Sequence, residues 1–99
     1  MRDILFIGDE VTAAGFRLAG VDTLVPGAGE GARAVAEALP ERRVILLTTE
    51  LGQGLPNAMV EKLLRSVDPV VVFLPDLRGH DGPLDLEGRV RRALGIEEL

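Results

Sequence analysis

The stretch ILFIGDEVTAAGFRLAGVDTLV, residues 4–25, contains the pattern from which the fold of this chain follows. It opens with an unbroken apolar run at residues 4–7, passes through a helical pattern at residues 10–19, and closes on a second apolar run at residues 22–25. Continuous apolar runs are typical of parallel strands that are covered on both faces. A helix between two such strands forms a βαβ unit with a right-handed crossover, so we predict that the chain begins with one.

The remainder of the sequence repeats this alternation of strand and helix. Apolar runs recur at residues 44–47 and 70–74, and helical patterns occupy residues 30–39 and 55–67. The run at 22–25 is the weakest and fits an edge strand. We therefore predict an α/β fold with a four-stranded parallel sheet and helices on both faces, the three-layer arrangement of flavodoxins and phosphoreceiver domains.

Beyond the last predicted strand the pattern changes. The segment PDLRGHDGPLD, residues 75–85, contains two prolines and two glycines and has no apolar period. A helical pattern then resumes and places Leu86, Val90 and Leu94 on one stripe. The sequence thus predicts an α/β core domain at residues 1–75, a flexible connection at 76–84 and a C-terminal helix at 85–99.

The composition excludes several classes of function. The 99 residues carry a net charge of −5 and include three phenylalanines but no tryptophan or tyrosine, whereas nucleic-acid surfaces need a basic footprint and often aromatic platforms. The absence of cysteine rules out a disulfide framework or a thiolate nucleophile. No apolar run is long enough for a signal peptide or a membrane span. We expect a cytoplasmic protein without a nucleic-acid partner.

Two acidic residues, Asp9 and Glu10, follow the first predicted strand, as the Mg²⁺-binding carboxylates do in phosphoreceiver domains. That chemistry also needs an aspartate after the third strand, where this chain has Thr48 and Thr49, and a lysine after the last strand, where it has none. Hydroxyls do not replace the acyl-phosphate carboxylate. We therefore interpret Asp9 as the cap of the first helix and Glu10 as a complement to its dipole.

The segment GAGEGA, residues 27–32, formally matches a dinucleotide-binding pattern, with Glu50 at the end of the next strand. However, it follows the weakest strand, Pro26 intervenes, and Glu30 would lie beside the phosphates. Glycines also serve any tight turn. The same caution applies to the single histidine, His80, which with two neighbouring aspartates could ligate a metal but is more often solvated on such a loop. We expect no catalytic residue, no cofactor and no metal.

The first helix carries the remaining candidates for a functional site. At 100° per residue, the residues predicted to lie on the sheet are Val11, Ala14, Gly15 and Leu18. Phe16 then points about 150° away from the centre of that face, and Arg17 also lies off it. Aromatic residues and arginine are enriched at interface hot spots, so the pair is a candidate partner contact. Alternatively, Phe16 packs under a neighbouring loop and Arg17 is a solvated charge.

These residues also carry a resemblance to a known family. GDEVTAAGFRLAGV, residues 8–21, resembles the signature of the F subunit of the V-type and A-type rotary ATPases (ATP synthases), although Val11 stands where the family usually has aspartate. The resemblance extends to VILLTTEL at 44–51, which corresponds to the third strand of that family and the start of the helix after it. It also extends to DPVVVFLPD at 68–76 and VRRALGIE at 90–97. It therefore covers nearly the whole chain.

The resemblance implies a non-catalytic rotor subunit of the central stalk. Such a subunit binds the coiled coil of the D subunit and couples ATP hydrolysis or synthesis in the A/B hexamer to ion translocation. Its C-terminal helix is mobile and a candidate contact with that hexamer, and it meets the membrane only through the complex, as part of the soluble sector. The expected contacts with the D subunit are Phe16, Arg17, Leu86, Arg89, Val90, Arg91, Arg92 and Leu94. The alternatives are a phosphoreceiver-like signalling domain without its phosphoacceptor and a small nucleotide-binding protein.

Overall fold

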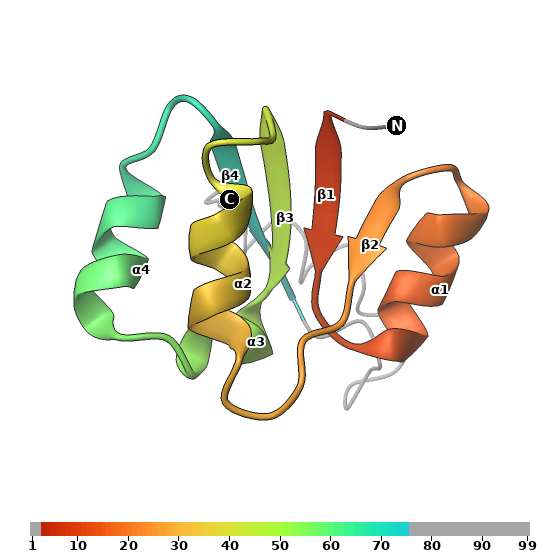
Figure 1. The fold of residues 1–99 in the computed structure, drawn as a ribbon, viewed down its shortest axis with the longest axis horizontal. Helices are drawn as coiled ribbons and strands as arrows, with labels where there is room; N and C mark the ends of the chain where they lie inside the picture. The colour runs from red at the N-terminus through yellow and green to blue at the C-terminus, as the bar shows by residue number, and fades with distance from the viewer. Residues whose placement is uncertain (1–2, 76–99) are drawn as a thin grey trace, which may run out of the picture.

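A computed structural model describes residues 3–75 and confirms the predicted α/β fold (Figure 1). Its single sheet is parallel throughout, with the strand order β2-β1-β3-β4. The strands are β1 (Ile4–Ile7), β2 (Asp22–Leu24), β3 (Val44–Thr48) and β4 (Val70–Leu74). As expected, β2 lies at an edge. The predicted connection at 76–84 and the C-terminal helix at 85–99 lie outside the described residues.

Four helices connect these strands: α1 (Glu10–Leu18), α2 (Gly31–Ala38), α3 (Thr49–Gln53) and α4 (Asn57–Leu64). The pattern at 55–67 predicted a longer helix than α4, which lies between its N-cap Pro56 and its C-cap Arg65. Helix α3 was not predicted from periodicity, because five residues are too few to display a helical period. No helix within residues 3–75 is both long and apolar enough to cross a membrane.

The main core lies between the sheet and helices α2 and α4. The buried side chains of this core are Leu5, Ile7, Val35, Ala38, Ile45, Leu47, Leu55 and Leu63. Successive residues of a strand point to opposite faces, so Phe6 faces away from this core, toward α1. Phe6 is fully buried there. Helices therefore cover both faces of the sheet, with α1 on one side and α2 and α4 on the other (Figure 1).

The turn after α1 follows the predicted pattern. Helix α1 ends at Leu18, and Gly20 has a φ of 89°, in the left-handed region that favours glycine. The Gly20 amide donates a hydrogen bond to the carbonyl of Arg17 at 3.0 Å. This bond satisfies one of the carbonyls left free at the end of the helix and turns the chain directly into β2.

Candidate functional site

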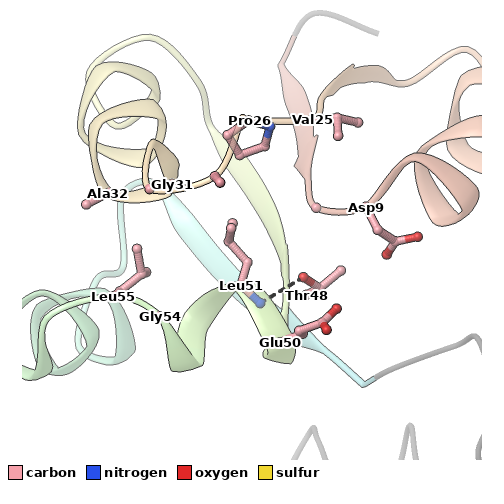
Figure 2. A pocket seen from close by; sticks show the side chains of 14 residues that line it. Asp9, Val25, Pro26, Gly31, Ala32, Thr48, Glu50, Leu51, Gly54 and Leu55 are labelled. Atoms are coloured by element: carbon pink, nitrogen blue, oxygen red, sulfur yellow. Dashed lines mark hydrogen bonds between the residues drawn. The ribbon is translucent and has the colours of Figure 1, made fainter.

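A hollow of about 380 Å³ opens at the carboxyl end of the sheet (Figure 2). Its walls come from the ends of β1 and β3, from α3 and from the loop before α2; they include Gly8, Asp9, Pro26, Gly31, Thr48, Glu50 and Leu51. Ligands of open α/β sheets bind at this edge, so the polar groups of the hollow decide whether it could perform chemistry.

Asp9 acts as the N-cap of α1, as the sequence predicted. Its carboxylate accepts hydrogen bonds from the Thr12 amide at 2.9 Å and from the Thr12 hydroxyl, also at 2.9 Å. The cap satisfies one of the backbone donors that have no partner at the start of a helix. The carboxylate is therefore engaged with its own helix rather than directed to a ligand in the hollow.

The two threonines at the end of β3 have structural roles as well. The Thr48 hydroxyl accepts a hydrogen bond from the Leu51 amide at 3.1 Å and caps α3, as Figure 2 shows. The Thr49 hydroxyl donates to the carbonyl of Leu74 at 2.7 Å, which links α3 to the end of β4. These two threonines occupy the position of the phosphoacceptor in a phosphoreceiver domain. In this chain they hold the start of a short helix instead.

The glycine-rich loop is explained by turn geometry and close packing. Gly29 has a φ of 78°, which requires glycine in practice. A Cβ on Gly31 would lie 2.9 Å from Cδ1 of Leu51, so a side chain at the start of α2 would require the Leu51 side chain of α3 to shift. The Glu30 carboxylate lies over the loop, with Oε1 3.1 Å from the position of a Cβ on Gly27. An acidic group at this place opposes the binding of a pyrophosphate.

The geometry within residues 3–75 also offers no metal-binding cluster, defined as three or more histidine, cysteine, aspartate or glutamate side chains close together. His80 and its neighbours Asp76 and Asp81 lie outside the described residues. Two polar side chains of the hollow, those of Asp9 and Thr48, thus cap the adjoining helices.

The structure reverses the predicted orientation of α1. The residue of α1 that is fully buried is Ala13, and the ring of Phe16 stacks on that of Phe6 with centroids 4.8 Å apart and planes 21° from parallel. Phe6 occupies the middle of β1 and needs a large apolar neighbour, which Phe16 provides better than valine or alanine. The prediction that Phe16 points away from the sheet was therefore wrong.

Four residues that were predicted to face the sheet lie on the opposite side of α1 instead. We call this set the outer stripe: Val11, Ala14, Gly15 and Leu18. All four are exposed, and the exposed fraction reaches 70% at Val11 and 92% at Leu18. A surface helix normally turns polar residues outward. Helix α1 is apolar on both its inner and its outer face, which marks the outer stripe as the unusual surface of this helix.

Arg17 lies on the flank of α1, beside the outer stripe. Its guanidinium forms an ion pair with the Glu10 carboxylate at 3.1 Å, and its Nε donates to the Thr23 hydroxyl at 3.1 Å. These bonds orient an exposed side chain, and exposed pairs of this kind contribute little to stability. Of the sequence-predicted contacts, only Phe16 and Arg17 lie within the described residues. Leu86, Arg89, Val90, Arg91, Arg92 and Leu94 lie outside them.

The described residues form a small α/β domain in which Asp9 and Thr48, at the carboxyl edge of the sheet, cap helices, while α1 presents apolar side chains to solvent. The chain belongs to the family described as ATP synthase (F/14-kDa) subunit, which it matches over residues 4–91. It is an accessory subunit rather than the catalytic one.

Curated relatives agree with this assignment. The chain is 33% identical over 98 residues to the F subunit of the V-type ATP synthase of Thermus thermophilus, with 92% of this chain and 94% of the relative covered. The protein of the same name from a second strain of that species matches to the same extent. No solved structure gave a significant match.

Proposed function

We propose that this chain is a rotor subunit of the central stalk, which binds the coiled-coil D subunit and couples rotation to ATP hydrolysis or synthesis. The observation that carries this proposal is the family match over residues 4–91. The roles of Asp9 and Thr48 as helix caps are consistent with it, because a rotor that transmits torque needs a stiff fold and a contact surface rather than a reactive group.

Within this proposal Phe16 and Arg17 have different tasks. The Phe16 ring stacks on Phe6 and sets the position of α1 on the sheet. Arg17 is held by Glu10 and Thr23 at the exposed flank of the helix, where its side chain is open to contact with the D subunit. The C-terminal helix supplies the other contacts, with Leu86, Val90 and Leu94 against the coiled coil and Arg89, Arg91 and Arg92 toward acidic residues of the stalk.

The chain also has a defined place in the enzyme under this proposal. It belongs to the soluble sector, reaches the membrane only through the complex, and meets the A/B hexamer through its C-terminal helix.

Hydrogen exchange tests the tail: the amides of residues 84–99 gain protection when the D subunit binds, and equal protection with and without that partner contradicts a tail that docks on the stalk.

Co-expression with the D subunit of the same organism tests the function directly. The expected result is a complex of one copy of each chain that survives size-exclusion chromatography. Circular dichroism of each chain alone confirms that both are folded. Two folded chains that elute separately at micromolar concentration would overturn the proposal.

A further inference from the structure

We propose that the outer stripe of α1 is the surface on which one helix of the partner coiled coil packs. The inference rests on the proposed function and adds to it the part of the core domain that receives the partner. The residues of the stripe, Val11, Ala14, Gly15 and Leu18, follow the spacing i, i+3, i+4, i+7. This spacing forms the seam that one helix presents to another.

The shape of the stripe fits a helix. Val11 and Leu18 stand about 10 Å apart along the axis of α1, and the small residues Ala14 and Gly15 lie between them. Large side chains at both ends and small ones in the middle form a notch that receives a large aliphatic side chain of a facing helix, as in knobs-into-holes packing. Both large side chains lie mostly in solvent in the described domain, with 70% and 92% of their surface exposed.

Gly15 provides an independent argument. A glycine in the middle of a helix lowers stability relative to alanine, so it calls for a reason. Its φ is not positive, and a Cβ added to it would meet no atom within 4 Å. The turns and packing contacts that account for Gly20, Gly29 and Gly31 are therefore absent at Gly15 within residues 3–75. A large partner side chain that enters the notch at the middle of α1 would supply the reason, because a side chain at position 15 would fill its place.

The area of the stripe argues against a second copy of this chain as the occupant. A nine-residue helix is about 14 Å long and about 10 Å wide, so its outer face offers on the order of 150 Å². A stable complex buries about 800 Å² on each partner. Two α1 helices packed on each other fall far below that area. A coiled coil extends beyond α1 at both ends and reaches further surfaces of the same molecule.

The test compares substitutions in the stripe with a matched one elsewhere. Leu18→Gln and Gly15→Gln place a polar side chain on the stripe, and Val67→Gln makes a similar change at a residue that is 86% exposed and lies next to the opposite edge strand, β4. Calorimetric titration with the D subunit measures affinity, and urea unfolding of the free chain measures stability.

We expect Leu18→Gln and Gly15→Gln each to weaken binding at least about tenfold, while Val67→Gln changes it less than about twofold. Gly15→Gln also raises the urea midpoint of the free chain, since glutamine is the better helix former. Loss of affinity together with a gain of stability supports a docking role, because a merely structural residue would lose both.

Three results overturn the inference. If the wild-type chain binds the D subunit and both stripe variants bind it equally well, the docking surface is elsewhere and the proposed function stands. If the wild-type chain does not bind that partner, both proposals fail. Sedimentation velocity of the chain alone completes the test, since a dimer that Leu18→Gln dissociates would assign the stripe to a second copy.

Discussion

Replacing Phe16 by alanine tests the orientation of α1, on which the position of the outer stripe depends. A fully buried phenylalanine loses about 3–5 kcal/mol of unfolding free energy when cut to alanine. Phe16 is half-buried and stacks on the fully buried Phe6 at 4.8 Å. Because Phe16 is only half-buried, we take half of that full value and expect Phe16→Ala to lower the unfolding free energy by about 2 kcal/mol. This loss includes about 0.5–1.5 kcal/mol from the stacked ring pair.

Leu18→Ala is the matched control for this measurement, because Leu18 is on the same helix. Its side chain is 92% exposed, so its removal should change the unfolding free energy by less than about 0.5 kcal/mol. Urea unfolding of both variants, monitored by circular dichroism, gives the two values. The comparison requires that the unfolding free energy falls with urea concentration at the same slope in both variants. If α1 instead lay on the sheet through Val11 and Leu18, the order would reverse: Leu18→Ala would lose about 2–5 kcal/mol and Phe16→Ala almost nothing. That reversal would refute the structural argument.

Three further predictions concern the carboxyl edge of the sheet. Asp9→Ala removes the cap of α1 and should lower the unfolding free energy by about 1 kcal/mol, while Asp9→Asn, which still caps, should leave it nearly unchanged; equal losses would show that the charge matters rather than the cap. Thr48→Val removes the cap of α3 and should cost about 1 kcal/mol in the same assay, so an unchanged midpoint would contradict the role of that hydroxyl. Gly8→Ala should destabilise by about 1–3 kcal/mol, because the new Cβ would lie 2.5 Å from Cγ2 of Thr48 and 2.7 Å from the Phe6 ring; a stable variant would show that these neighbours can move.

The strands and the cap of α1 were predictable because their signals are local. A continuous apolar run identifies a buried parallel strand, and an aspartate directly before a helical pattern identifies a cap. The weak run at 22–25 also indicated its edge position correctly. Helix α3 was expected only through the resemblance and not from a helical period, because this short helix is held by a single cap, at Thr48, and by a hydrogen bond from Thr49 to the distant Leu74.

The orientation of α1 was not predictable from the helix alone, because both of its faces are apolar. Its direction depends on Phe6, which lies on a different element and requires a large neighbour across the interface. The signal was present in the sequence as an aromatic residue in the middle of β1 and another in α1. The two aromatic residues can be paired only by noting that successive side chains of β1 point to opposite faces of the sheet, which turns Phe6 away from the main core and toward α1.

Thiol labelling shows whether the outer stripe is covered in the complex, because the chain has no cysteine and accepts a single reporter. Leu18→Cys places a thiol on the outer stripe and Val67→Cys places one next to the opposite edge strand, both at residues that are mostly exposed in the free chain. With the D subunit at saturation, we expect modification of the thiol at position 18 to slow at least about tenfold while that at position 67 stays within about twofold. Equal labelling at position 18 with and without this partner, in a sample where the complex is present, would contradict docking on the first helix.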